Sequence, residues 1–366
     1  MFFKKHNGSV SGSLNALAWK KFKKNKLGFG ALIFIGLTFL IACLGYLITP
    51  DQTPYANGQY LELGLKKPGF SVWMLKIQED SNKNTQGLFS MIIKGREEQG
   101  RFIPIRAWSV VNNTIYYVNY DAVPGDPSGV GSAQVDRVEM PIKQRFWFGT
   151  DRFGRDFLSQ LMIGTRVSLS VGLISVAISL LIGILLGAIG GFYRGRIDSL
   201  IVWLINVVWS IPTLLLVIAI TFALGKGFWQ VFIAVGLTMW VEVARVVRGQ
   251  ILSIREKEYV EAARALGFSD FRIIFNHILP NVTAPVIVIS AANFASAILM
   301  EAGLSFLGLG VQPPVPSWGS MIKENYGYIV LDYAYLAVLP GIAIMMIVMA
   351  FMLVGNALRD SLDVRI

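Results

Sequence analysis

The sequence predicts an all-α polytopic membrane protein with six transmembrane helices and a small β-rich external insertion between the first two. Three observations lead to this prediction. Of the 366 residues, 54% are hydrophobic and only 15% are charged, whereas soluble domains carry about 25% charged residues. Apolar runs of about 20 residues, long enough to cross a bilayer, recur along the chain. A long segment of mixed polarity separates the first run from the others.

The predicted spans are these apolar runs. Pro212 lies inside the third run and should kink it, and the Ser210 hydroxyl can take up a freed backbone bond. Cys43, the single cysteine, lies inside the first run, which we interpret as a retained span rather than a cleaved lipoprotein signal. The runs cover residues 27–48, 167–190, 200–224, 228–247, 283–306 and 336–358.

Charge predicts the orientation. The first 26 residues hold seven lysines and no acid, and such basic flanks remain in the cytoplasm. Membrane topology therefore explains the net charge of +10 without a nucleic-acid partner, and lipid is the expected surroundings. The resulting organisation is a cytoplasmic tail 1–26, the first span 27–48, an external region 49–166, a five-helix core 167–358 with a cytoplasmic loop 248–282, and a cytoplasmic tail 359–366.

The external region is too long to be only a connector. Residues 106–120 contain two short runs of β-branched and aromatic residues on either side of Asn112 and Asn113, a pattern typical of a β-hairpin. We therefore predict a β-rich insertion over about residues 67–144.

Sequence signatures of catalysis are absent. The chain has no glycine-rich phosphate loop ending in Gly-Lys-Ser/Thr, so we expect no ATP hydrolysis by that route. His6 and His277 are the only histidines, and neither has a neighbour at metal-ligand spacing. We predict no catalytic residue, no metal site and no cofactor in this chain.

The cytoplasmic segment 256–280 has a helix–turn–helix pattern. Residues 256–266 are rich in strong helix formers, and Gly267 should end that helix. Ser269 or Asp270 can cap a second short helix, which Pro280 is expected to end.

This segment also carries features suited to a docking surface. The adjacent Ala262 and Ala263 should keep one helix face slim enough for close contact, while Glu261 and Arg264 provide charge. An ordinary cytoplasmic loop is the alternative. The segment resembles the EAA loop of ABC-importer permeases, with His277 standing where that pattern has isoleucine. The matching residues are Glu261, Ala262, Ala263, Gly267, Leu279 and Pro280. The resemblance implies a MetI-like permease fold in which Glu261 to Pro280, Arg264 included, couples the chain to an ATPase.

Two further stretches narrow the resemblance. Residues 148–156 and 301–310 are similar to segments of C-type subunits in the dipeptide, oligopeptide and nickel permease family. The first stretch supplies the external motif Gly149, Thr150, Asp151, Gly154, Arg155 and Asp156. The resemblance implies a non-catalytic permease subunit of a peptide importer in the bacterial inner membrane. Its implied partners are a homologous B-type permease, two ABC ATPase subunits that bind ATP and Mg²⁺, and an external solute-binding protein.

Charged and polar residues near the membrane have more than one interpretation. The charged residues of 151–156 can fix the first turn of the second span, or can meet the solute-binding protein or the peptide. Asn206, Asn293 and Glu301 are candidates for the substrate path, although an ion pair or a position at the membrane interface are alternatives for Glu301. Glu242 and Arg245, three residues apart, are expected to pair with each other.

Other functions are also compatible with the sequence. Within the same family, nickel chelates or antimicrobial peptide conjugates are alternative substrates. An ion-driven secondary transporter is the main alternative of another class, but such folds show inverted repeats that we do not find here. A membrane-anchored protein whose external insertion is the active part is a further alternative.

Overall fold

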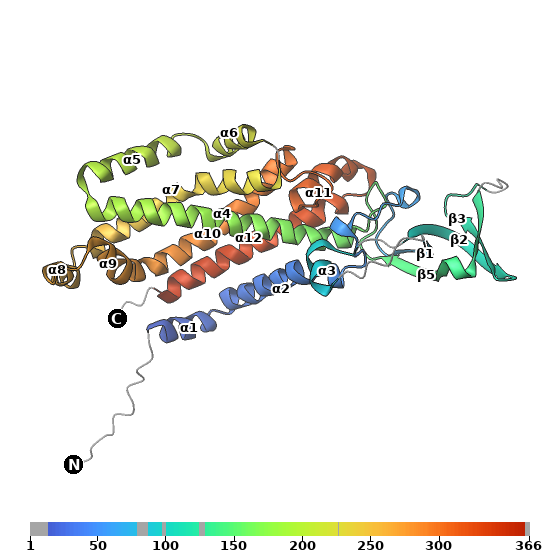
Figure 1. Ribbon diagram of the computed structural model, residues 1–366, viewed down its shortest axis with the longest axis horizontal. Coiled ribbons are helices and arrows are strands. Elements are labelled where there is room, and N and C mark those ends of the chain that lie inside the picture. The colour runs from blue at the N-terminus through green and yellow to red at the C-terminus, as the bar shows by residue number, and fades with distance from the viewer. Residues whose placement is uncertain (1–13, 79–86, 97–99, 124–128, 226, 363–366) are drawn as a thin grey trace, which may run out of the picture.

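The computed structural model describes residues 14–78, 87–96, 100–123, 129–225 and 227–362. A bundle of long helices carries an antiparallel sheet at one end (Figure 1). The helices α8 (Glu258–Ala265) and α9 (Asp270–Arg272) lie at the opposite end of the bundle. We call these two ends the sheet end and the α8 end.

Five helices of the described chain are long and apolar enough to cross a membrane. Each contains one of the predicted spans but extends beyond it, because the flanking polar residues continue the helix. These helices are α2 (Lys26–Ile48), α4 (Phe157–Tyr193), α7 (Phe228–Ile254), α10 (Leu279–Phe306) and α12 (Tyr335–Leu362).

The predicted third span is broken rather than kinked. Helices α5 (Gly195–Trp209) and α6 (Thr213–Leu224) meet at 91°, so the described residues contain five helices long and apolar enough to cross a membrane, or six if this pair counts as one span. Pro212 explains the break, because its ring excludes a helical neighbour on its N-terminal side and it has no N–H to donate. Ser210 Oγ donates to the Val207 carbonyl at 2.7 Å and so satisfies one of the freed acceptors.

Glycines let α4 and α7 approach closely. A Cβ added to Gly183 would lie 2.5 Å from Val243 Cβ, and one added to Gly187 would lie 2.6 Å from the Ala244 carbonyl oxygen. Small residues at helix contacts are how helices pack within a bilayer. The bundle is therefore organised around the α4–α7 contact.

The prediction that Pro280 ends a short helix is wrong. A π-helical turn (Ile273–Ile278) follows α9 and runs directly into α10, so residues 270–306 form one continuous rod. In the π turn the Leu279 N–H donates to the Ile274 carbonyl, five residues back. Pro280 then falls in the first turn of α10, where the register changes from the π turn to the α-helix.

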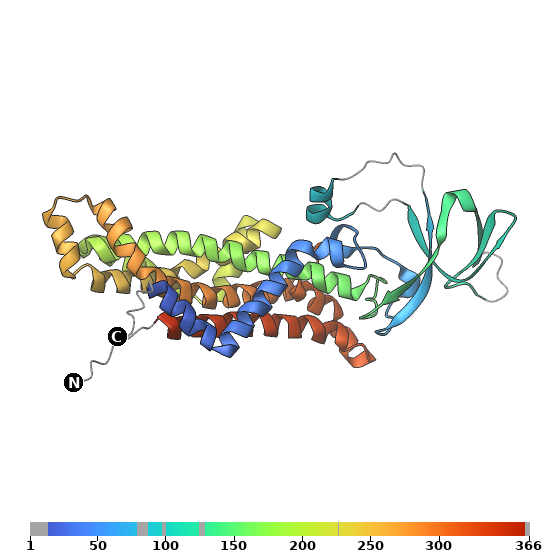
Figure 2. The ribbon, with the colours of Figure 1, turned by 90° about the horizontal axis from the view of Figure 1, so that it is seen from below.

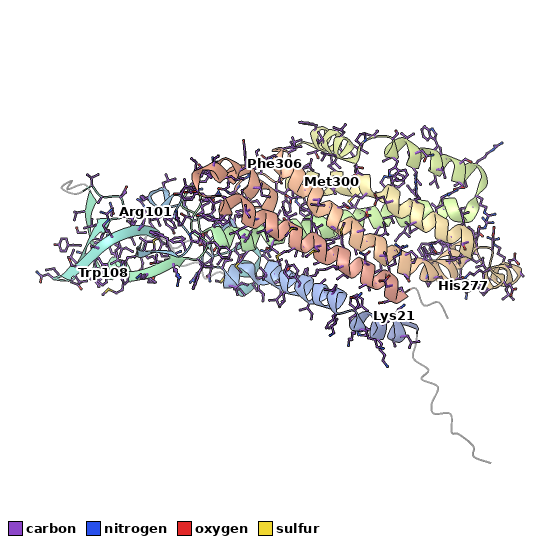
Figure 3. The ribbon with its side chains drawn as sticks, turned by 180° about the vertical axis from the view of Figure 1, so that it is seen from behind. Lys21, Arg101, Trp108, His277, Met300 and Phe306 are labelled. Carbon is purple, nitrogen blue, oxygen red and sulfur yellow. The ribbon has the colours of Figure 1, made fainter. Side chains whose placement is uncertain are left out.

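Part of the predicted basic tail is helical. Helix α1 (Leu14–Lys24) packs its buried Phe22 against Val354 and Ala357 of α12. The Asn25 side chain then accepts a hydrogen bond from the Gly28 N–H and caps α2. Lys21 lies on α1, far from the sheet (Figure 3).

The predicted small antiparallel sheet is present, and Figure 2 shows that it projects beyond the helices. Its strand order is β4-β3-β2-β1-β5. Asn112 and Asn113 both have positive φ, 48° and 61°, and form the predicted tight turn between β2 and β3. The strands are β1 (Phe70–Ile77), β2 (Arg101–Val111), β3 (Thr114–Asn119), β4 (Val130–Gln134) and β5 (Val138–Phe146).

Short helices complete the described chain at the sheet end. Two of them, α3 (Leu88–Lys94) and α11 (Trp318–Asn325), are α-helical. The remainder are 3-10 turns: η1 (Pro54–Ala56), η2 (Leu61–Leu63), η4 (Val135–Arg137) and η6 (Tyr326–Leu331).

Candidate functional site

Helix α8 divides the matched Glu-Ala-Ala residues between two faces. Ala263 is 4% exposed and packs with Val260 into the apolar core, whereas Glu261, Ala262 and Arg264 are exposed. Successive helical residues point about 100° apart, so the two alanines cannot share one slim face as predicted. Ala262 lies on the outward face, and Ala263 anchors the helix to the bundle.

Gly267 closes α8 through its backbone conformation. Its φ is +76°, and the Phe268 N–H donates to the Ala263 carbonyl, five residues back, as in a Schellman motif. A Cβ added to Gly267 would meet no atom within 4 Å, so glycine is favoured here by φ and not by space. Ser269 Oγ then accepts the Arg272 N–H and caps α9, as expected.

Large apolar side chains are exposed on this surface. The exposed fractions of Leu266 and Phe271 are 74% and 70%, and the Phe275 ring lies 4.3 Å from the Phe271 ring between centroids. With the charges of Glu261 and Arg264, they form what we call the α8 surface. Exposed apolar groups rimmed by charge are typical of a protein–protein contact.

The α8 surface is firmly attached to the long helices. Val260 and Ala263 pack against Ile273, Ile278 and Val282, which belong to the rod leading into α10. This contact makes α8 and α10 one packed unit, since apolar interiors are dense and transmit displacement.

His277, the mismatch in the resemblance, takes part in this attachment. Its ring stacks on Phe268, with centroids 5.8 Å apart, and its carbonyl accepts from Asn281 Nδ2 at 2.7 Å. Figure 3 places His277 at the α8 end. Leu279 is partly buried in the same core and Pro280 is exposed. The histidine therefore serves packing in the position where the family pattern has isoleucine.

A second contact joins the α4–α5 turn to the end of α7. Arg248 donates two hydrogen bonds to the carboxylate of Asp198, at 2.5 Å and 2.7 Å, and Arg194 pairs with Glu256. Sequence reasoning missed both pairs, because their partners lie 50 and 62 residues apart.

The external motif forms a compact hydrogen-bonded cluster with residues 60–66 at the sheet end. Thr150 Oγ1 donates to the Leu63 carbonyl at 2.5 Å and accepts the Lys66 N–H at 2.8 Å. Gly154 has φ +73°, and an added Cβ would lie 1.7 Å from the Tyr60 carbonyl oxygen. The motif thus clamps residues 60–66 against the start of α4.

Gly149 has a similar role in this hydrogen-bonded cluster. Its φ is +74°, and a Cβ there would lie 2.2 Å from the Lys66 carbonyl oxygen. Two positions of the motif are therefore restricted to glycine by close backbone contact as well as by φ.

Buried charged side chains also belong to this hydrogen-bonded cluster. Arg155 donates from Nε to Asp151 Oδ2 at 2.6 Å and from Nη2 to Glu324 Oε2 at 2.8 Å. Asp156 caps α4, since its Oδ2 accepts the Ser159 N–H at 2.9 Å. Burial raises the pKa of Asp151 despite the opposing effect of Arg155, and burial raises the pKa of Asp156 to about 6.

The three candidates for the substrate path do not lie together. Asn206 is exposed on α5, whereas Asn293 and Glu301 are 1% and 0% exposed inside the bundle. Glu301 Oε1 accepts from Ser305 Oγ at 2.6 Å, and Glu301 forms no ion pair with the described residues. In this conformation only Asn206 can face a pore or a partner.

The predicted Glu242–Arg245 pair is also wrong. The Arg245 guanidinium lies 3.5 Å from the ring centroid of Trp209, and the described chain contains no ion pair between Arg245 and Glu242. A cation over an indole face is favourable in an apolar setting. Arg245 therefore contacts Trp209 of α5 instead of Glu242, the partner that i,i+3 spacing predicts.

Comparison with protein-family models matches two parts of the chain. The family described as "Binding-protein-dependent transport system inner membrane component" matches residues 179–366. The family described as "N-terminal TM domain of oligopeptide transport permease C" matches residues 13–68. Neither match includes the sheet.

Curated relatives are similar over about three fifths of this chain. The glutathione transport system permease protein GsiD of Pectobacterium atrosepticum is 39% identical over 228 residues, 62% of this chain and 75% of the relative. The dipeptide transport system permease protein DppC of Alkalihalophilus pseudofirmus is 41% identical, covering 62% and 74%. The di/tripeptide permease protein DppC of Pseudomonas aeruginosa is 43% identical, covering 60% and 72%.

Solved structures are similar at a lower level. An inward-facing MetNI methionine ABC transporter aligns with a TM-score of 0.47 and 17% identity, over 55% of this chain and 95% of that one. An amino acid ABC transporter with histidines gives 0.43 and 17%, over 56% and 98%. The family assignment therefore rests on the sequence matches and not on these structures.

Proposed function

This chain belongs to the family of binding-protein-dependent transport system inner membrane components, and from that premise we propose that it is the non-catalytic permease subunit of an ATP-driven peptide importer. The α8 surface is the observation that carries the proposal. It combines exposed aromatic and charged side chains with a rigid attachment to the membrane helices. A transported peptide accounts best for the relatives, whose names specify dipeptides, di/tripeptides and glutathione.

In this proposal the α8 surface docks on ATPase subunits that bind ATP and Mg²⁺. Phe271 and Leu266 would enter an apolar groove, and Glu261 and Arg264 would fix the orientation by pairing at its rim. The four side chains are exposed in this chain, so they are available for such contacts.

Force would pass from α8 into the bundle as a rigid-body movement. When the ATPases close on ATP, they would carry α8 with them. Val260 and Ala263 would push on Ile273 and Ile278, and the unbroken rod over residues 270–306 would carry the displacement to the sheet end. A hinge at Pro280 would have absorbed that movement, but the helix is continuous there.

The remaining partners follow from the same proposal. A homologous permease would complete the pore, and Asn206 on the exposed face of α5 is our candidate for a residue on the peptide path. The α8 end would lie in the cytoplasm with both termini. The sheet end would face outward, towards a solute-binding protein.

Co-purification of the intact complex tests the docking claim. Glu261→Arg should reduce the recovery of ATPase subunits with this chain, and peptide-stimulated ATP hydrolysis should fall with it. Glu62→Arg, a charge reversal of an exposed glutamate at the sheet end, is the matched control and should leave the recovery of ATPase subunits unchanged. Full assembly and activity in Glu261→Arg would contradict the proposed docking role.

A further inference from the structure

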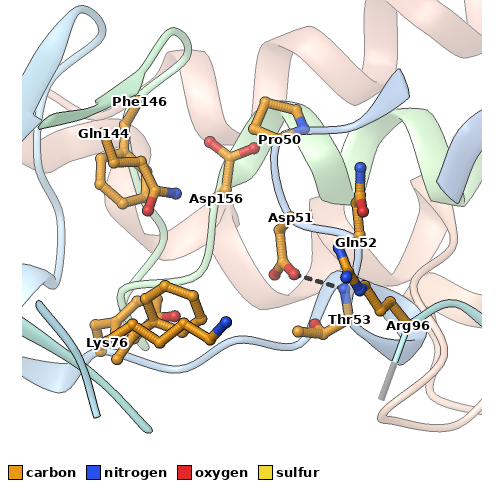
Figure 4. A pocket seen from close by; sticks show the side chains of 11 residues that line it. Pro50, Asp51, Gln52, Thr53, Lys76, Arg96, Gln144, Phe146 and Asp156 are labelled. Atoms are coloured by element: carbon orange, nitrogen blue, oxygen red, sulfur yellow. Dashed lines mark hydrogen bonds between the residues drawn. The ribbon is translucent and has the colours of Figure 1, made fainter. Parts of the chain in front are cut away.

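A small polar pocket lies where the sheet meets the helical bundle. Its volume is about 190 Å³, smaller than the roughly 300 Å³ at which pockets for drug-sized ligands begin. It is bounded by the segment after α2, by strands β1, β2 and β5, and by the start of α4 (Figure 4). It is distant from the α8 surface, at the other end of the molecule.

One wall of the pocket presents an acceptor that lacks a donor. Asp156 is 2% exposed, and its Oδ2 is occupied by Ser159. Its Oδ1 has no hydrogen-bond partner in the described part of the chain. A buried oxygen left without a donor costs free energy, and a ligand that donates a hydrogen bond would remove that cost.

A cation suits this wall better than a neutral donor. The carboxylate of Asp51 lines the same pocket and is held by the Thr53 and Gly58 N–H groups, at 2.8 Å and 3.0 Å. Each of these bonds uses one lone pair, so acceptor capacity remains on both oxygens. Asp51 adds to the effect of burial in raising the pKa of Asp156. A bound ammonium would offset both negative charges.

The other side of the pocket is basic. Figure 4 shows Lys76 and Arg96 at the opposite end of the view from Asp156, with Arg96 drawn next to Thr53 and nearer to Asp51 than to Asp156. Lys76 Nζ is already paired with Glu139 at 2.5 Å. Arg96 is exposed, and its guanidinium forms no ion pair or hydrogen bond with the described residues. A free guanidinium is the side chain best shaped to hold a carboxylate.

These two sides define the ligand. We propose that the pocket binds a small zwitterion, a free α-amino acid or a dipeptide, with its ammonium on Asp156 and Asp51 and its carboxylate on Arg96. The walls formed by Phe102 and Phe146 leave room for a short apolar portion between the two ends. This site is separate from the proposed pore, and it needs neither ATP hydrolysis nor the partner subunits to bind its ligand.

Calorimetric titration of the full-length chain in detergent, without a solute-binding protein, tests the site. The probes are L-alanine, glycylglycine and triglycine, which differ in length. Glycylglycinamide lacks the carboxylate and N-acetylglycylglycine lacks the ammonium. We expect saturable binding of L-alanine or glycylglycine, and about ten- to a hundredfold weaker binding of both blocked probes, the loss of one charge-assisted hydrogen bond.

Variants locate the binding. Arg96→Ala and Asp156→Asn should each weaken the binding of the zwitterion by a similar factor. Arg106→Ala, which removes an exposed arginine of the same sheet that does not line the pocket, should not. Absence of saturable binding, or unchanged affinity in Arg96→Ala, would overturn the proposal. Since the titration contains no ATPase, either result would leave the docking claim for the α8 surface intact.

Discussion

Arg155 donates a 2.8 Å hydrogen bond to Glu324, although 169 residues separate the two in the chain. The same guanidinium holds Asp151, so one arginine joins the start of α4 to α11. The arginine and Asp151 side chains are 9% and 1% exposed, whereas that of Glu324 is 23% exposed. The two halves of this network should therefore differ in their contribution to stability.

Arg155→Ala should destabilise the protein by about 3 kcal/mol, because it leaves Asp151 buried without its cation. Glu324→Gln removes only the more exposed partner and should cost about 1 kcal/mol. Thermal unfolding of the two variants in detergent checks the order. Equal losses would mean that Asp151 does not depend on Arg155.

Gly267→Ala should destabilise the turn after α8 by about 1 kcal/mol, because φ at this position is +76°. Peptide-stimulated ATP hydrolysis should fall as α8 loses its fixed position. Gly249→Ala is the matched control, since Gly249 is an exposed residue within α7 and an added Cβ meets no atom within 4 Å. Its activity and stability should equal or exceed those of the parent protein. A Gly267→Ala protein with full activity would show that the turn geometry is not needed for coupling.

Gly187→Ala should destabilise the α4–α7 contact by about 1–3 kcal/mol, the usual cost of overpacking. The new Cβ would lie 2.6 Å from the Ala244 carbonyl oxygen, a backbone atom that cannot rotate away. Gly36→Ala in α2, where an added Cβ meets nothing within 4 Å, should be neutral. Chemical denaturation in mixed micelles distinguishes the two variants, and similar midpoints for both would argue against a tight α4–α7 contact.

The stability contributed by Asp156 should depend on pH. Its pKa in the folded protein is about 6, above the ordinary 3.8, so folding disfavours the ionised form. The penalty is absent below about pH 4, grows as the pH rises through 6, and reaches about 3 kcal/mol above that. Asp156→Asn keeps a capping side chain without the charge, and so should be more stable than the parent protein at pH 7.

The free-energy difference between Asp156→Asn and the parent protein, measured from pH 4 to pH 8, isolates this carboxyl from Asp151, which titrates in both proteins. A difference that does not change with pH would show that Asp156 is not destabilised by ionisation.

Much of the helical architecture could be predicted because its signals are local. An apolar run of bilayer length is legible without any knowledge of neighbours, and the Asn112–Asn113 turn and the Gly267 stop are each set by residues that tolerate positive φ. Pro212 was recognisable as a site of distortion. The 91° angle between α5 and α6 could not be predicted, because it depends on how these two helices pack against other helices.

Predictions about side-chain partners were less successful, because partners are chosen by tertiary contacts and not by local sequence. Local spacing favours Glu242 for Arg245, yet Trp209 takes the cation from another helix. Pro280 is a helix terminator by local rules, yet the π turn before it places the ring where helix can continue. For Arg245 the tertiary contact outweighs a local pairing preference of about 0.2–0.5 kcal/mol. For Pro280 the π turn changes the helix register at a residue that ordinarily breaks a helix.

The sequence by itself determined that the chain is a membrane protein, where its apolar helices lie, and where the turn after α8 falls. These properties depend on hydrophobic length and on backbone preferences of single residues. Only the tertiary structure decided that Ala263 faces inward, that Asn293 and Glu301 are buried, and that Asp51, Arg96 and Asp156 surround one pocket. Residues that meet across tens to hundreds of positions leave no periodic or local pattern, so folding alone brings them together.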